Sequence, residues 1–283
     1  EPDSFALPLF TEGLYTRFSD NVIPDNALSE ATNVLIDEDV DGVVVRRKGF
    51  AKCNTTAVAN SKTFRGLWSF RATDGTEYEV GMSSESFFSH TGDCQWTAIT
   101  GMNGFSSTAN IECVPYLARL WCVDRAKVVS WDGSSTQTIS GAPLGSLIGG
   151  FRNRILIADI SGSQSRLRLS GELDGTNWTV PSPAVSTSPT NLDIGGTNDG
   201  KKIACLMGSY GDKYLIGKQD KLFALHGFDR RDFVIREISQ EVGCLEDKTV
   251  QEKNNGLYWL SKRGIEKLYG TTIVLNFIAA TSL

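Results

Sequence analysis

The 283-residue chain has a globular composition, with 40% hydrophobic and 22% charged residues, which excludes disorder over its whole length. Its 28 glycines against 8 prolines favour many hairpins. The formal charge of -5 excludes a broad cationic surface for nucleic acid, and no apolar run reaches the roughly 18 residues of a membrane-spanning helix.

Residues 1–60 differ in character from the rest and are expected to form an N-terminal arm outside any repeat. One or two helical turns are predicted at residues 27–32, which follow a proline. Residues 33–37 and 43–46 predict a hairpin, with Gly42 supplying the positive φ of its turn. Because such an arm must dock on something, we expect it to contact a ring or its neighbours.

From residue 64 onward short strands alternate with polar turns. Strands are predicted at residues 67–70, 78–81, 86–89, 118–123, 127–131, 136–139, 153–158, 166–170, 178–180, 203–207, 213–217, 222–226, 233–238, 256–261 and 264–269. Residues 181–190 hold three prolines among serines and threonines. This segment is predicted to be a loop, because proline cannot donate to a central ladder.

A polar turn followed by an aromatic residue recurs along the strand-rich part. The fullest copy is residues 170–179, with Asp174, Gly175 and Trp178, and an earlier copy pairs Asp74-Gly75 with Tyr78. Turn-plus-aromatic units at intervals of a few tens of residues are typical of β-propeller blades. The fold class expected is therefore all-β, a β-propeller of five or six blades over residues 61–283.

The turn at residues 170–179 loosely resembles the Asp-box of sialidases and related propellers. Asp174 is expected to bond to its own turn backbone, while Trp178 packs between sheets. The prediction for this turn is structural and not catalytic. The six tryptophans as a group are likewise expected in blade cores.

Residues suited to catalysis or metal binding are sparse. His90 and His226 are the only histidines, and each is expected to be a surface or hydrogen-bonded polar residue and not a general base. The acidic run at 37–41 favours a solvated turn, with a weak cation site as the alternative. Arg230-Arg231 favours a solvated strand edge. We predict no catalytic, cofactor-binding or metal-binding residue, no cofactor and no enzyme activity.

The cysteines lie at wide, irregular intervals that exclude the common zinc spacings. They are residues Cys53, Cys94, Cys113, Cys122, Cys205 and Cys244. Cys113 and Cys122 flank a possible hairpin and could pair, but free thiols in a reducing compartment are the expectation.

Several short segments, in order, resemble bacteriophage tail proteins of the tubular B or nozzle type and related stabilisation proteins of short-tailed phages. The segments near the start are residues 13–14, 23–27, 31–35 and 42–50, and the later ones are 169–170, 178–179, 214–216, 241–244, 256–261 and 264–265. No single segment is diagnostic, and together they span most of the chain.

The resemblance implies a structural virion protein: a propeller subunit of a ring, commonly sixfold, that continues the DNA exit channel and helps retain and then release the genome. Expected partners are copies of itself, forming a hexamer, with adaptor and fibre proteins, while DNA passes without sequence-specific binding. The implied location is the virion, after synthesis in the bacterial cytoplasm. The turn at Asp174 and the many acids leave two alternatives: a sialidase-like glycan hydrolase and a glycan-binding propeller.

Overall fold

The computed structural model describes residues 63–196, 201–253 and 256–269, with short stretches and single positions between residues 13 and 58. The chain divides into two compact units, Glu1–Cys53 and Asn54–Leu283. The acidic run at 37–41 lies outside the described residues. No helix in the described part is long and apolar enough to cross a membrane.

In the first unit, the described residues form two small strand pairs. β1 (Gly13–Leu14) runs parallel to β2 (Ala27–Leu28), and β3 (Val34–Ile36) runs antiparallel to β4 (Val44–Arg46). The predicted hairpin is confirmed. The helix predicted at residues 27–32 is wrong at Ala27–Leu28, because an isolated helix of one or two turns is marginal in water and pairing with another strand gives this backbone its partners.

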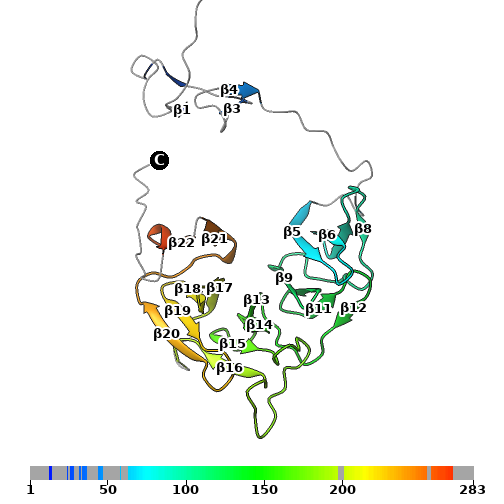
Figure 1. The fold of residues 1–283 in the computed structure, drawn as a ribbon, viewed down its shortest axis with the longest axis vertical. Coiled ribbons are helices and arrows are strands. Elements are labelled where there is room, and N and C mark those ends of the chain that lie inside the picture. Colours follow the sequence, from blue (N-terminus) through cyan, green and yellow to red (C-terminus); the bar gives the residue numbers. More distant parts are fainter. Residues whose placement is uncertain are drawn as a thin grey trace, which may run out of the picture. The chain divides into compact units, whose positions relative to one another are not determined.

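The second unit contains five antiparallel sheets in chain order, one per blade (Figure 1). Blade 1 contains β5 (Phe64–Arg71), β6 (Glu77–Ser83), β7 (Ser86–His90) and β8 (Thr97–Ala98), and blade 2 contains β9 (Glu112–Tyr116), β10 (Arg119–Val123), β11 (Val128–Trp131) and β12 (Thr136–Thr138). Blade 3 contains β13 (Leu147–Phe151), β14 (Arg154–Ala158), β15 (Arg166–Leu169) and β16 (Thr190–Asp193). Blade 4 contains β17 (Ile203–Tyr210), β18 (Lys213–Lys218), β19 (Leu222–His226) and β20 (Val234–Ser239). Blade 5 contains β21 (Gln251–Lys253), β22 (Gly256–Ser261) and β23 (Gly264–Tyr269), preceded by the 3-10 turn η2 (Asp247–Thr249).

The all-β propeller prediction is confirmed, with five blades. Strands β9, β13 and β16 were not predicted, and the strand predicted at residues 178–180 is wrong, since these residues belong to the β15–β16 connection. The β15–β16 connection contains most of the predicted loop but begins earlier in the chain. It ends at Thr190, the first residue of β16.

Adjacent blades share buried cores because both faces of the middle strands are apolar. In β10, Leu120 and Cys122 pack toward blade 1, while Trp121 and Val123 pack toward blade 3. Further clusters join blades 3 and 4 and blades 4 and 5. Among the described residues, four such clusters join five blades. The end blades carry exposed apolar side chains, including Leu67 of β5 at 67% exposure.

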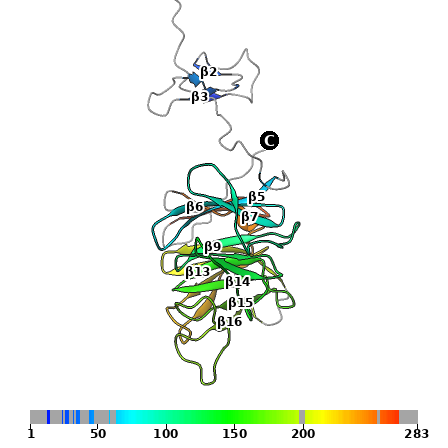
Figure 2. The ribbon, with the colours of Figure 1, turned by 90° about the vertical axis from the view of Figure 1, so that its right-hand side faces the viewer.

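The alternating strands place the connections on two faces. The first strands β9, β13 and β17 lie against one another along the channel, and in blade 3 the strands β13 to β16 follow one another in order away from them (Figure 2). We call the lower face the end of the propeller at which the first strand of each blade connects to the second strand and the third strand connects to the fourth. The upper face carries the second-to-third connections and the links between blades.

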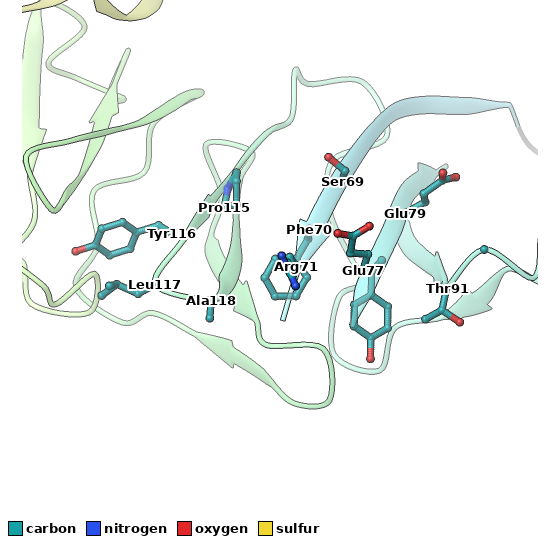
Figure 3. A pocket seen from close by; sticks show the side chains of 12 residues that line it. Ser69, Phe70, Arg71, Glu77, Glu79, Thr91, Pro115, Tyr116, Leu117 and Ala118 are labelled. Carbon is teal, nitrogen blue, oxygen red and sulfur yellow. The ribbon is translucent and has the colours of Figure 1, made fainter. Parts of the chain in front are cut away.

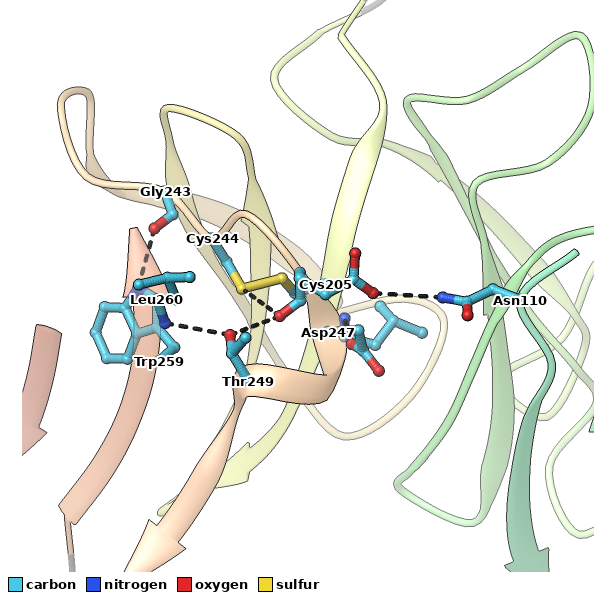
Figure 4. The surroundings of a disulfide bond; sticks show 10 residues. Asn110, Cys205, Gly243, Cys244, Asp247, Thr249, Trp259 and Leu260 are labelled. Carbon is cyan, nitrogen blue, oxygen red and sulfur yellow. Dashed lines mark hydrogen bonds between the residues drawn. A yellow bond between two sulfur atoms is a disulfide. The ribbon is translucent and has the colours of Figure 1, made fainter. Parts of the chain in front are cut away.

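Cysteine pairing corrects one expectation. Cys113 of β9 bonds to Cys122, its register partner in β10. Cys205 of β17 bonds to Cys244, which lies ahead of blade 5, with an S–S distance of 2.02 Å (Figure 4). Free thiols were therefore the wrong expectation for these four residues. The sequence left the Cys113–Cys122 pair as an alternative, whereas the Cys205–Cys244 pair depends on packing between blades, which the spacing of the cysteines does not indicate.

One buried arginine organises the long β15–β16 connection. The guanidinium of Arg154 in β14 is fully buried and donates to the carbonyls of Ser170, Thr187, Ser188 and Ser186 at 2.7–3.2 Å. Glu172 provides the nearby negative charge at 3.6 Å. Because its two terminal nitrogens donate to main-chain oxygens at both ends of the connection, Arg154 ties these ends together.

Candidate functional site

The upper face gathers polar side chains at the mouth of the channel. Residues just ahead of β9, β13, β17 and η2 meet the connections that follow β10 and β14 there. They enclose a cavity of about 280 Å³ whose polar lining comes from Asn110, Arg125, Ser146, Asp159, Lys202 and Glu246. Four of these six side chains are ionisable, two acidic and two basic, so the cavity suits a small polar molecule better than an apolar one.

An ion pair spans blades 2 and 3 in this cavity. Arg125 pairs with Asp159, and the Ser146 hydroxyl donates to the same carboxylate oxygen at 2.5 Å. Both Arg125 and Asp159 have left-handed backbone, with φ of 68° and 52°. Non-glycine residues adopt this conformation at a cost of order 1–3 kcal/mol, which surrounding contacts must offset. The pair is therefore fixed in place before any ligand arrives.

A second group of charges connects blade 2 to the segment that leads into blade 5. Asn110 donates to Glu246 at 3.3 Å, and the Lys248 ammonium lies 3.9 Å from Glu112. Asp247 accepts a hydrogen bond of 2.7 Å from the Leu206 amide. Figure 4 shows Asn110 reaching from blade 2 toward this segment, beside Asp247. The contacts of Asn110 and Glu112 join parts of the chain that are 136 residues apart.

Two carboxyl groups in this cluster are unusually weak acids. Burial, together with the negative charge of Asp247, raises the pKa of Glu112 to about 7, and its side chain is only 15% exposed. Burial also raises the pKa of Asp247 to about 6, against the lowering effect of the Leu206 hydrogen bond. Near neutral pH such groups can give or take a proton, which is the chemistry a general acid needs.

Replacing Glu112 by glutamine is expected to change how stability depends on pH. Because the folded pKa of about 7 exceeds the ordinary 4.5, the folded state holds a proton that the unfolded state has lost. The free energy of unfolding of the parent protein should therefore fall by about 2–3 kcal/mol as pH rises from 4.5 to above 7. Urea unfolding at pH 5 and pH 8 should show a smaller fall in Glu112→Gln, and an equal fall would contradict the assignment.

A larger pocket of about 620 Å³ opens on the lower face between blades 1 and 2. Figure 3 shows Pro115, Leu117 and Ala118 on one side and Phe70 with Glu77 on the other. Leu117 and Ala118 both have left-handed backbone, as a two-residue hairpin turn requires. The sequence predicted neither this pocket nor the upper cavity, because each is built from connections that are distant along the chain.

The two histidines behave as predicted for hydrogen-bonded or surface residues. His90 is buried, donates from Nε2 to Glu79 at 2.9 Å and accepts the Gly92 amide on Nδ1 at 3.0 Å. Its ring packs against Trp96. His226 ends β19 and lies outside both cavities.

The turn around Asp174 is structural in every contact described. Asp174 accepts from the amide and hydroxyl of Thr176 at 2.9 and 2.6 Å. The Ser170 hydroxyl accepts the Ile155 amide at 3.0 Å, and the buried Trp178 indole donates to Gly175 at 2.9 Å. Four of the six tryptophans, Trp121, Trp131, Trp178 and Trp259, are buried between or within blades, as predicted for blade cores, whereas Trp68 and Trp96 are only partly buried.

The arginine pair at 230–231 is not simply solvated. Arg231 forms an ion pair with Asp229 at 3.0 Å, and Arg230 donates to the carbonyls of Ser186 and Pro189. These bonds attach the β19–β20 connection to the long connection of blade 3. Within the described residues, no group of three or more potential metal-ligating side chains occurs.

The chain matches no known family model, and no curated protein matches it. Among solved structures, it is similar to the extracellular domain of a two-component system from B. thetaiotaomicron (12% identity, TM-score 0.54), covering 82% of this chain and 29% of the other. Virginiamycin B lyase from Staphylococcus aureus is similar at 11% identity and TM-score 0.53, covering 86% and 76%. YCF48 bound to D1 peptide is similar at 10% identity and TM-score 0.52, covering 82% and 71%.

The chain thus spans less than a third of the first of these proteins and about three quarters of the second. The roles in their names differ widely, and identities this low show shared architecture only. What the likeness establishes is the fold: residues 63–269 form a five-bladed β-propeller.

Proposed function

We propose that this chain is a structural virion protein of a bacteriophage tail, of the nozzle or tail tubular type. The observation that carries the proposal is the ordered set of short segments, from residues 13–14 to residues 264–265, that resembles those proteins. The chain acts in a homo-oligomeric ring, expected to be a hexamer, that continues the DNA exit channel. Its partners there are adaptor and fibre proteins.

Three physical features support this proposal. A propeller presents many connections on a rigid frame, which suits contacts between subunits. The net charge of -5 lets DNA pass without adhering to the wall. The disulfides at Cys113–Cys122 and Cys205–Cys244 suit a protein that is made in the host cytoplasm and then persists on an extracellular particle, since virion surfaces lie in oxidising surroundings.

Electron microscopy tests the proposal directly. The purified protein should form rings with a central passage, and an antibody raised against it should label the tails of intact particles of the source phage. A protein that stays monomeric and is absent from purified particles would refute the proposal. An unrelated antibody of the same class is the control for labelling.

A glycan hydrolase or glycan-binding propeller is the second candidate, and one observation favours it. Glu112 and Asp247 at the channel mouth have pKa values raised to about 7 and about 6, and glycosidases use a carboxyl group with a raised pKa as proton donor. Assays on sialosides and bacterial polysaccharides decide between the readings. Turnover that Glu112→Gln or Asp247→Asn abolishes would establish the enzyme, and saturable binding without turnover would establish the binding module.

A further inference from the structure

Phe228 is an exposed aromatic side chain held rigidly at the tip of the β19–β20 connection. It is 67% exposed, and the Arg152 guanidinium lies over its ring at 4.1 Å. Arg152 is itself fixed by bonds to the carbonyls of Gly227 and Asp212. The Asp232 carboxylate accepts the amides of Phe228 and Asp229 at 2.9 and 2.8 Å. Fixing an apolar ring in solvent this way has no evident benefit for folding.

Such a side chain is typical of a binding anchor. Rigid aromatic and arginine side chains dominate interface energies because little entropy is lost when they bind. Phe228 projects from the lower face, where Leu173 is also exposed at a left-handed backbone position, with φ of 56°. We call Phe228 with Arg152 and residues 229–232 the knob. Its charges are three arginines against two aspartates.

The lower-face pocket has the complementary character. Its volume of about 620 Å³ is several times that of one phenyl ring, and Phe70, Tyr78 and Pro115 give it apolar and aromatic walls. Its charged lining is Glu77, Glu79 and Arg71, two carboxylates against one arginine. The knob is formed by blade 4 and the β13–β14 turn of blade 3, which supplies Arg152, whereas the pocket lies between blades 1 and 2, so the rigid frame keeps a knob from filling its own pocket.

We infer that the knob of one molecule binds the lower-face pocket of a second copy of this chain. Phe228 enters between the aromatic walls, and the cationic flank of the knob faces the acidic rim. The occupant is a second copy because the chain itself carries both halves of the contact, with opposite net charges and matched apolar character. The contact does not depend on the virion role proposed above.

Symmetry limits the assemblies that such a contact can build. If the operation that seats one knob in one pocket is two-fold, both molecules exchange knobs and a dimer closes. If it is not two-fold, one molecule of the pair keeps a free pocket and the other keeps a free knob, and the contact repeats into a ring or filament. The knob–pocket contact is the same in both arrangements. The mass of the wild-type assembly distinguishes a closed dimer from a ring or filament.

Two variants each disable one half of the contact. Phe228→Ser removes the anchor and leaves the pocket intact. Glu77→Arg with Thr91→Arg turns the pocket cationic and leaves the knob intact; both residues are exposed. Sedimentation equilibrium of the full chain should show self-association in wild type, weakened at least about 30-fold in either variant, as expected for loss of a hot spot.

Mixing the two variants gives the sharpest result. The knob of Glu77→Arg/Thr91→Arg can enter the pocket of Phe228→Ser, so the mixture should form one-to-one dimers although each variant alone stays monomeric. A chain carrying all three substitutions should not associate with itself. Leu144→Glu, an exposed residue on the upper face, is the matched control and should associate like wild type. Circular dichroism should show that all variants fold.

Several results would overturn the inference. Wild type that remains monomeric at its highest soluble concentration, a Phe228→Ser variant that associates like wild type, or a mixture that shows no dimers would each do so. These results are separate from the test of the virion role. If the variants lose association and the protein is absent from particles, the knob–pocket contact is supported and the virion role is rejected. If the antibody labels tails but the variants associate like wild type, the virion role is supported and the contact is rejected.

Discussion

Replacing Trp178 by alanine is expected to lower the free energy of unfolding by about 3–5 kcal/mol, the usual cost of truncating a buried tryptophan. The Trp178 side chain is 3% exposed and lies in the core between blades 2 and 3 with Trp121 and Ile155. Gly175 brings the turn so close that a Cβ there would lie 2.6 Å from both of these side chains. The surroundings therefore have little freedom to fill the space left by the indole. Urea unfolding followed by tryptophan fluorescence measures the loss.

Two further variants separate packing from turn chemistry. Trp178→Phe keeps most of the apolar area and loses the indole bond to Gly175, so it should cost about 1–2 kcal/mol. Asp174→Ala removes only the exposed bonds to Thr176 and should cost about 1 kcal/mol or less. If Asp174→Ala cost as much as Trp178→Ala, the turn would be more than a support for the buried indole, and its structural assignment would be wrong.

Removing the disulfide between Cys205 and Cys244 is the other change with a large expected effect. The bond closes a 39-residue separation, so the double variant Cys205→Ala/Cys244→Ala should lose about 4 kcal/mol on the chain-entropy estimate. Both residues are fully buried in the core between blades 4 and 5. The expected loss should concentrate there, with faster amide exchange in β22 than in β10.

The second disulfide provides a matched control. Cys113–Cys122 closes a separation of only 9 residues within one ladder, and the same estimate gives about 2–3 kcal/mol for Cys113→Ala/Cys122→Ala. Thermal unfolding of both double variants, with and without a reducing agent, compares them. A reducing agent should destabilise the parent protein and should destabilise each double variant less, because each variant has already lost one of the bonds that the agent breaks. An unchanged parent protein would show that the thiols are not paired in solution.

The sequence predicted the middle strands of the blades well, because both of their faces are buried and their apolar pattern is continuous. It missed the first strands of blades 2 and 3 for a physical reason. β9 contains Pro115 and β13 contains Gly149 and Gly150, residues that usually argue against a strand. Gly149 is required because a Cβ there would lie 2.1 Å from the Tyr214 hydroxyl oxygen. The tight packing around the channel therefore outweighs the low strand propensity of these proline and glycine residues.

The upper cavity was beyond prediction from one sequence. In the sequence, Arg125, Asp159 and Glu112 each look like ordinary turn or strand residues. They come together only because each blade brings the chain back to the upper face. The Cys113–Cys122 pair depended on β9, which the sequence did not reveal. In contrast, the Asp174 turn was readable because its bonds join residues two or three positions apart.

The four shared cores among five blades give the described propeller two terminal sheets, so its cooperativity should resemble that of a linear array. Interior blades have a neighbour on each side, whereas blades 1 and 5 each contribute to one core. In such an array, free energies of local opening depend on nearest neighbours and are smallest at the termini. Native-state proteolysis should therefore begin in the terminal sheets and proceed inward, with blade 3 the last to be cleaved.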